Sequence, residues 1–407
     1  MSKVELLAPA GNYLKFKTAL YFGADAVYIG GKDFSLRAFS DNFSDEEIEK
    51  AVKEAHEKNV KIYVTVNIFA RNYDFCKAAE YFRFLEDINV DAVLITDPGL
   101  ISLCKEVAPN LRIHLSTQAN TLNKYAVRFW AKQGVERVVL ARELSLAEIK
   151  EIHEFCPETQ LEAFVHGAMC ISYSGRCLLS NYFNGRDANR GECVQACRWS
   201  YELREKSKSG EFFPVEEDGR GTYVLNSKDL NMINHIGEMI ESGICSLKIE
   251  GRMKSEYYLA TVVNAYRRAI DEYYKIGDKY AKNTMFYDEL KKTNHRAFTT
   301  AYMFGDNDET VNYEDTQSSG EKQFIAVVTE GSDGKGYFVA EMRNRFKKGD
   351  RIFIYDLPEK NPDPIINYPL IKLEFDKLPR YRFASYFPQL NGGRDDRKIV
   401  RADNLWK

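Results

Sequence analysis

One repeating pattern runs through the first 274 residues of the 407-residue chain and restricts the folds that it can adopt. A short run of apolar, often β-branched residues is followed by a turn and then by a segment with helical periodicity. Such runs are typical of parallel strands, which are buried on both faces when helices cross between them. Seven runs follow one another, at residues 5–9, 26–30, 61–67, 92–96, 112–117, 137–141 and 160–167.

The segments between the runs carry helix start signals. Ser44 with Glu47, and Ser145 with Glu148, each predict a capping box at a helix N-terminus. Residues 246–250 predict an eighth strand, and residues 255–274 predict its helix. Strict alternation of this kind favours an α/β fold, a (β/α)8 TIM-like barrel, over an open doubly wound sheet. No G-x-G-x-x-G motif follows the first run, which argues against a dinucleotide-binding fold.

The alternation is interrupted once and then ends, which predicts the domain organisation. We expect a barrel domain at residues 1–274, with an insertion at 168–222 between the seventh and eighth strands. Residues 275–322 are polar and turn-rich and predict a linker. Short strand-like runs within 323–407 predict a small C-terminal all-β, β-barrel-like domain. The insertion follows the carboxyl end of a strand, at the mouth where barrel enzymes carry their chemistry.

The insertion holds four of the eight cysteines of the chain, Cys170, Cys177, Cys193 and Cys197, among glycine and asparagine residues. Turn-rich connections let several thiolates converge on one soft-metal site. Structural zinc sites usually use paired C-x2–4-C knuckles, and only Cys193 and Cys197 form one. The spacing therefore favours an iron–sulfur cluster, with zinc as the alternative. Packing of the thiols as small apolar groups is the non-functional interpretation. Cys245, just before the eighth strand, is a further candidate ligand.

Charge and hydropathy exclude some classes of function. The formal net charge is −3, so the chain offers no overall basic field to nucleic acid, and any polyanion site must be a local patch. No apolar run approaches the roughly 18 residues of a membrane span, and the N-terminus lacks the apolar core of a secretory signal. We therefore expect a cytoplasmic protein without a membrane partner, in which the cysteines stay reduced.

Two side chains on the seventh run are candidate catalytic residues. His166 lies near the end of this run, four residues before Cys170. At a barrel rim it suits an acid, a base or a hydrogen-bond donor to a metal ligand, and a structural rim histidine is the alternative. Glu162, on the same run, is the second candidate.

Cationic side chains near the expected mouth are candidates for substrate binding. Arg186, Arg190 and Arg198 interleave with aromatic residues in the insertion, a combination that suits phosphates and unstacked bases. Lys248 and Arg252 lie at and just after the eighth strand and suit an anionic small molecule. A solvated surface and ordinary ion pairing are the alternatives.

Six motifs resemble those of the collagenase-like peptidase family U32. The family signature E-A-F-V-H-G-A-M-C-x6-C-L-L-S matches residues 162–180. Five further stretches are similar to the same family: L-L-A-P-A-G-N at 6–12, G-A-D-A-V-Y-I-G at 23–30, R-G-E-C-V-Q-A-C-R-W at 190–199, N-S-K-D-L at 226–230 and K-I-E-G-R-M-K at 248–254. The resemblance covers the whole chain, including the C-terminal domain.

The resemblance implies a function as well as a fold. Some family members are described as peptidases, and others use an iron–sulfur cluster to hydroxylate RNA or a quinone precursor without oxygen. The full-length match most resembles the branch that hydroxylates wobble uridine in tRNA to 5-hydroxyuridine. This implies tRNA as partner, a 4Fe–4S cluster, and prephenate, a small dicarboxylate, as the source of the hydroxyl function. A peptidase and a non-catalytic RNA-binding partner are the alternatives, and a paralogous family member is a possible partner.

The resemblance also implies a set of cluster ligands. By position, the family's cluster-binding cysteines match Cys170, Cys177 and Cys193. Several relatives have a fourth cysteine just after S-K-D-L, where this chain has Asn231. Cys197 is then the first candidate for the fourth ligand, and Cys245 is the second. A three-cysteine cluster with an open iron is the remaining alternative.

Overall fold

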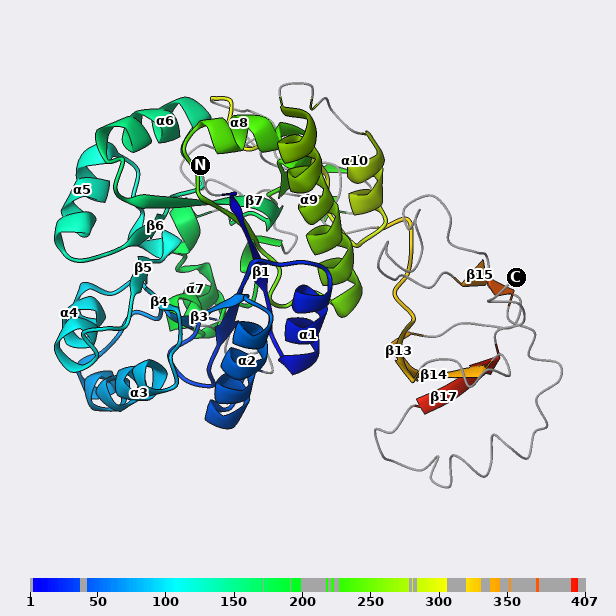
Figure 1. The fold of residues 1–407 in the computed structure, drawn as a ribbon, viewed down its shortest axis with the longest axis horizontal. Helices are drawn as coiled ribbons and strands as arrows, with labels where there is room; N and C mark the ends of the chain where they lie inside the picture. Colours follow the sequence, from blue (N-terminus) through cyan, green and yellow to red (C-terminus); the bar gives the residue numbers. More distant parts are fainter. Residues whose placement is uncertain are drawn as a thin grey trace, which may run out of the picture. The chain divides into compact units, whose positions relative to one another are not determined.

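The structure is a computed structural model of the chain. It describes residues 3–36, 42–170, 172–190, 192–198, 217–218, 221–222, 227–277, 280, 284–305, 320–330, 337–344, 351–352, 371–372 and 397–401. The chain divides into two compact units, Met1–Gly320 and Glu321–Lys407 (Figure 1). Among the described helices, none combines the length and the apolar character that crossing a bilayer demands.

A closed barrel of parallel strands forms the centre of the first unit (Figure 1). Strands β1 to β7 pair in sequence order, and β11 closes the barrel by pairing in parallel with both β7 and β1. The predicted TIM-like barrel is therefore confirmed. The barrel strands are β1 (Glu5–Pro9), β2 (Ala26–Gly30), β3 (Lys61–Val66), β4 (Ala92–Ile95), β5 (Ile113–Leu115), β6 (Arg137–Val139), β7 (Gln160–Ala168) and β11 (Ser246–Ile249).

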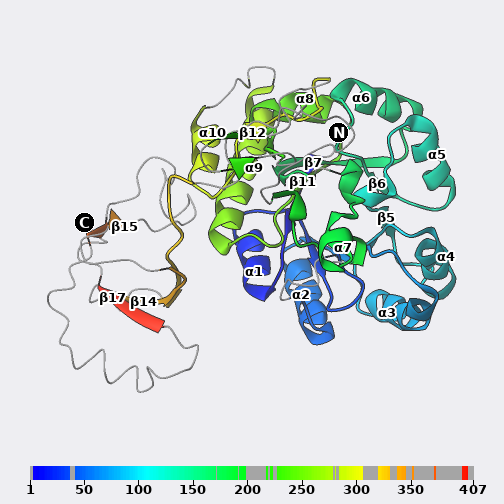
Figure 2. The ribbon, with the colours of Figure 1, turned by 180° about the vertical axis from the view of Figure 1, so that it is seen from behind.

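Helices alternate with the strands and surround the barrel (Figures 1 and 2). Both predicted capping boxes are present, with Ser44 accepting from the backbone of Glu47 and Ser145 from that of Glu148. The helices of this layer are α1 (Tyr13–Tyr21), α2 (Asp45–Glu57), α3 (Phe75–Asp87), α4 (Pro98–Val107), α5 (Lys124–Lys132), α6 (Leu146–Phe155), α8 (Ile236–Glu241) and α9 (Glu256–Ile276).

The apolar core lies between the strands and this helical layer. Leu6, Ile29 and Ile62 on the strands are fully buried, as are Phe16 on α1 and Phe82 on α3. Strands covered on both faces need apolar side chains at successive positions, which explains the continuous apolar runs of the sequence. The core thus holds the strands in register and fixes the positions of the loops at their ends.

Four short helical elements follow β7 in the predicted insertion: η3 (Tyr173–Gly175), α7 (Leu179–Asn184), η4 (Ala188–Arg190) and η5 (Ala196–Arg198). Further along, β8 (Glu217–Asp218) and β9 (Gly221–Thr222) form an antiparallel pair. Residues 171, 191, 199–216 and 219–220 of the insertion lie outside the described residues.

An additional strand extends the sheet beside β7. β10 (Asp229–Asn231) pairs antiparallel with β7, and β12 (Phe298–Thr299) pairs in parallel with β10. α10 (Thr284–Lys291) packs against α9. The segment assigned to a linker from the sequence, 275–322, therefore carries a helix and a paired strand of the first unit, which extends to Gly320.

The described elements of the second unit are strands. β13 (Ala326–Glu330) and β17 (Arg397–Arg401) both pair antiparallel with β14 (Tyr337–Met342). β15 (Arg351–Ile352) pairs antiparallel with β16 (Ile371–Lys372). The remainder of the predicted C-terminal domain lies outside the described residues.

Candidate functional site

Residues 172–198, which we call the lid, leave β7 at the carboxyl end of the barrel and are tied to the loops that follow other strands. The backbone N–H and the hydroxyl of Ser174 donate to the carboxylate of Glu143, after β6, at 2.8 and 2.7 Å. The Nε of Arg176 donates to the backbone carbonyl of Gln118, after β5, at 2.7 Å. These bonds attach the first part of the lid above β5 and β6.

The second part of the lid reaches the loop after β3. Arg190 donates to the carbonyl of Phe69 at 2.9 Å and forms a two-pronged ion pair with Asp74, at 3.0 and 3.3 Å. The N–H of Phe69 donates in return to the carbonyl of Asn189 at 3.2 Å. Since β3 and β7 lie on different sides of an eight-stranded barrel, the lid spans the mouth between them.

Three lid-region cysteines share one local geometry. In each, the thiol sulfur accepts a hydrogen bond from the backbone N–H two residues later. Such N–H···S bonds tune sulfur ligands in metal sites. The pairs are Ser172 with Cys170, Leu179 with Cys177 at 3.4 Å, and Gln195 with Cys193 at 3.4 Å.

Cys177 and Cys193 lie near enough to Cys170 to affect its pKa. Burial is the main cause that raises the pKa of Cys170, and the neighbouring Cys177 and Cys193 raise it further. The N–H of Ser172 and the guanidinium of Arg142 act in the opposite direction. The segments that carry Cys177 and Cys193 therefore lie in the neighbourhood of Cys170, although the three residues are spread over 24 positions of sequence.

Two hydrogen bonds connect the loops that carry these cysteines. The side-chain Nδ2 of Asn189 donates to the carbonyl of Cys177 at 3.2 Å. The buried hydroxyl of Ser180 accepts from the N–H of Val194, next to Cys193, at 3.1 Å. The loops of Cys177 and Cys193 are therefore connected by specific polar contacts.

The described residues do not bring three or more His, Cys, Asp or Glu side chains into the arrangement that holds a metal ion. Cys170, Cys177 and Cys193 still offer three soft donors in one region of the described chain, the type of side chain that both zinc and iron–sulfur clusters use.

The two candidates for a fourth ligand have different positions. Cys197 is half-buried on η5, four residues after Cys193, and lies in the lid. Cys245 precedes β11, at the amino end of the barrel, where its thiol donates to the carbonyl of Leu161 at 3.3 Å. Burial raises the pKa of Cys245 to about 11. The structure thus places Cys245 at the end of the barrel opposite to the lid.

His166 lies on β7 just before the lid and is buried among aromatic rings. Its Nδ1 is 3.4 Å from the hydroxyl of Tyr266, and Asn231 on β10 is its partner in the strand register. Burial lowers the pKa of His166 to about 3, so the imidazole is neutral at physiological pH. A neutral, enclosed histidine suits a hydrogen-bonding role at the mouth better than that of a proton donor.

Arg252 is enclosed in the mouth on the side of β2 and β3. Its guanidinium donates to the hydroxyl of Thr65 and to the side-chain oxygen of Asn42, both at 3.0 Å. A Cβ at Gly30 would lie 2.6 Å from this guanidinium, so glycine is required there for a close approach. The predicted anion-binding residue is therefore buried and contacts neutral polar groups of the barrel.

Arg142 is a mouth residue that the sequence patterns did not reveal. It follows β6, donates to the carbonyl of Ala168 at 3.1 Å and lies 4.1 Å from the centre of the Phe164 ring. One of its nitrogens is 3.7 Å from the carboxylate of Glu250. Arg142 thus holds the chain at the point where β7 passes into the segment carrying Cys170. A lone arginine after a strand gives no motif, so only the register of β6 and β7 could have found it.

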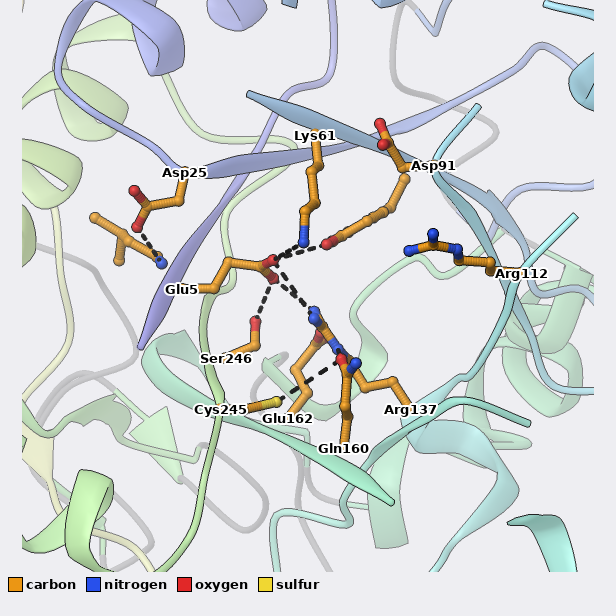
Figure 3. A network of polar contacts seen from close by, with 12 residues as sticks. Glu5, Asp25, Lys61, Asp91, Arg112, Arg137, Gln160, Glu162, Cys245 and Ser246 are labelled. Atoms are coloured by element: carbon orange, nitrogen blue, oxygen red, sulfur yellow. Dashed lines mark hydrogen bonds and ion pairs between the residues drawn. The ribbon is translucent and has the colours of Figure 1, made fainter. Parts of the chain in front are cut away.

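Glu162 and Lys248 meet inside the barrel. Glu162 is fully buried, 2.7 Å from the ammonium of Lys248 and 3.1 Å from the guanidinium of Arg137. Arg137 also pairs with Glu5, which accepts from Ser246 at 2.8 Å (Figure 3). Glu5, Arg137 and Ser246 are the first residues of their strands, so this network fills the amino end of the barrel. That end of a barrel usually serves stability.

The remaining predicted arginines lie on the lid. Arg186 is exposed, after α7. Arg190 is the residue that ties η4 to Asp74. The side chain of Arg198 lies outside the described residues. The structure therefore places Cys177, Cys193, Cys197 and two predicted arginines on the lid, with Cys170 just before it, and keeps Glu162 and Lys248 apart from them.

Comparison with known proteins decides the family. The model of Peptidase family U32 matches residues 11–313, more than half of the chain. The chain belongs to peptidase family U32. This U32 protein is 44% identical over 356 residues to tRNA hydroxylation protein P1 of Bacillus subtilis, covering 86% of this chain and 83% of that protein.

Two further relatives come from Escherichia coli. The U32 protein is 37% identical over 418 residues to tRNA hydroxylation protein P, covering 92% of this chain and 90% of the relative. It is 34% identical over 307 residues to 23S rRNA 5-hydroxycytidine C2501 synthase, covering 74% of this chain and 45% of that longer protein. The resemblance predicted from the six sequence motifs is thus confirmed at the level of the family.

Proposed function

We propose that this U32 protein is an RNA hydroxylase that converts the wobble uridine of tRNA to 5-hydroxyuridine. The observation that carries the proposal is the match to proteins named for tRNA hydroxylation, at 37–44% identity over more than four fifths of both chains. A relative named as an rRNA 5-hydroxycytidine synthase supports the same class of reaction on a second kind of RNA.

We further propose that the lid holds an iron–sulfur cluster of the 4Fe–4S type. Cys170, Cys177 and Cys193 would be its ligands, with Cys197 as the fourth. Their shared N–H···S geometry and their proximity support this assignment. When bound, such a cluster supplies electron transfer at the barrel mouth.

The overall reaction needs a hydroxyl donor other than oxygen, and we propose prephenate. The C5–H bond of uracil is replaced by a C5–O bond, and the hydrogen leaves as a proton. The two electrons withdrawn from the base pass to the donor as it gives up its hydroxyl group, and the donor takes up a proton at that carbon, so that the two half-reactions balance. The residues of this chain would contribute enclosure: the lid covers the mouth, fixed by Arg176 and Arg190, and restricts access of water.

The test is hydroxylation by anaerobically purified protein. Transfer RNA lacking the modification is incubated with prephenate, and 5-hydroxyuridine is quantified by mass spectrometry. We expect product, and we expect iron and acid-labile sulfide to co-purify with the wild type and with Cys104→Ser, which alters a buried thiol on α4. Cys177→Ser is expected to lose both iron and product. Cleavage of denatured collagen by the iron-free protein, with no product on tRNA, would instead favour a peptidase.

A further inference from the structure

We infer that a cavity at the edge of the lid binds the unstacked pyrimidine base of the RNA substrate, an inference that rests on the proposed function. The cavity has a volume of about 520 Å³, within the range of roughly 300–1,000 Å³ typical of small-molecule sites. Two segments form its walls, the loop after β3 and the lid. The cavity is lined by residues that include Phe69, Arg71, Leu178, Asn181, Asp187 and Asn189.

The cavity adjoins the loop of a proposed cluster ligand. Leu178 in its wall directly follows Cys177 in the chain. Asn189, also in the wall, donates to the backbone carbonyl of Cys177 at 3.2 Å. A base in the cavity would therefore lie beside the Cys177 loop. In the proposed reaction the C5 atom of this base is hydroxylated, so the base has to lie near the proposed cluster ligands.

The apolar part of the wall suits a flat ring. The guanidinium of Arg176 lies over the Phe69 ring, 5.5 Å from its centre, and so supports one face of the aromatic group. Leu178 is 72% exposed and adds apolar surface to the same wall. Bases stack on aromatic rings such as that of Phe69 whatever their sequence.

The polar part of the wall suits the edge of a pyrimidine. Asn181 is exposed on α7 and carries an amide that can both donate and accept. The carboxylate of Asp187 is oriented by the N–H of Asn189, which donates to its Oδ1 at 2.8 Å. Uracil offers an N3–H donor flanked by two carbonyl acceptors, which an amide and a carboxylate can match. Arg71 adds a cation that suits the phosphate of the same nucleotide.

The surface on the same two segments suits the neighbouring nucleotides. Tyr73 is 74% exposed, Tyr173 58% and Phe183 45%. Along the chain they alternate with Arg71, Arg176, Arg186 and Arg190, and Arg190 is paired with Asp74. Aromatic faces alternating with cations are the usual means of binding single-stranded RNA, whose bases are unstacked and whose backbone is anionic. A looped RNA strand is thus favoured over a peptide as the occupant.

The experiment compares two anticodon stem–loop RNAs, one with uridine and one with an abasic site at the wobble position. Binding to the holoprotein is measured by fluorescence anisotropy. We expect the wild type to bind the uridine RNA at least about tenfold more tightly than the abasic RNA, the scale of one stacked base. Leu178→Ala and Asn181→Ala alter exposed side chains, so they leave folding intact, and each is expected to abolish most of this preference.

Phe129→Ala is the matched control, because Phe129 is 54% exposed on α5, away from the lid, and should leave the preference unchanged. Equal binding of the two RNAs by the wild type would overturn the pocket assignment, as would a full preference in both lid variants. Hydroxylation of tRNA by the wild type is measured in parallel. If tRNA is hydroxylated but the wild type shows no preference for the uridine RNA, the pocket assignment is refuted and the proposed function stands. If tRNA is not hydroxylated, the proposed function is refuted, and the pocket inference that rests on it falls as well.

Discussion

Replacement of Arg137 by methionine tests whether the polar network at the amino end of the barrel is structural. The Arg137 side chain is 5% exposed and pairs with Glu162, which is fully buried, and with Glu5, which is 11% exposed. Removing one member of a buried pair typically costs about 3–5 kcal/mol, because a charge is left uncompensated.

The remaining contacts set the size of the effect. In the variant, Glu162 keeps the ammonium of Lys248 at 2.7 Å, and Glu5 keeps the hydroxyl groups of Tyr63 and Ser246 at 2.7 and 2.8 Å. We therefore expect the lower end of the range, a loss of about 3 kcal/mol in the free energy of unfolding. Urea denaturation followed by circular dichroism measures it, and hydroxylation per folded molecule should be retained.

Lys61→Met is the matched control for this variant. Lys61 also pairs with Glu5, but at 3.7 Å and with 51% of its side chain exposed. An exposed pair of this kind contributes less than about 1 kcal/mol. Equal stability losses in the two variants, or a loss below about 1 kcal/mol for Arg137→Met, would refute the structural role. Loss of activity in a stably folded variant would point to catalysis by Glu162.

The same network predicts that the stability of the folded protein decreases at acid pH. Burial alone would raise the pKa of Glu5, but Arg137 and the hydrogen-bond donors outweigh it and lower the pKa below its ordinary value of 4.5. The stabilisation is therefore present above pH 4.5 and is lost as the pH falls through the lower pKa of the folded state. Arg137→Met should weaken this dependence, which urea titrations at pH 5.5 and 3.5 can detect.

Three further changes test the account elsewhere. Gly167→Ala should destabilise the barrel by roughly 2 kcal/mol or more, because φ is +108° and the new Cβ would lie 2.4 Å from the carbonyl oxygen of Glu250; thermal unfolding measures this. Asp229→Asn should cost about 3 kcal/mol, because it removes the buried partner of Arg296, 2.6 Å away; urea denaturation is the assay, and an unchanged midpoint would contradict it. Burial lowers the pKa of His166 to about 3, so stability should fall as the pH drops from about 6.5 to 3; His166→Gln should show a shallower fall in the same titration.

The barrel follows from local patterns in the sequence. Each apolar run and each capping box spans only a few adjacent residues. The strand order of a barrel then follows from the alternation of strands and helices along the chain. The lid cysteines are equally visible, because their crowding is a local feature. The position of Cys245 was also open to reasoning: a residue that precedes a parallel strand lies at the amino end of the barrel, away from the mouth.

The polar contacts inside the molecule depend on register, which local patterns do not reveal. Arg137 meets Glu162 because β6 and β7 pair with residue 137 opposite residue 160. Asp229 in the S-K-D-L motif meets Arg296, 67 residues later, through the pairing of β10 and β12. From its charge, Lys248 is predicted to bind substrate. In the structure it is paired with a buried partner inside the barrel.

Complementation of a deletion strain tests the central claim most directly. Nucleosides of its tRNA are quantified after expression of the wild type, Cys177→Ser or Cys104→Ser, in a host without a second route to the modification. We expect 5-hydroxyuridine-derived nucleosides to return with the wild type and with Cys104→Ser and to stay absent with Cys177→Ser. Equal restoration by Cys177→Ser, or no restoration by the wild type, would contradict it.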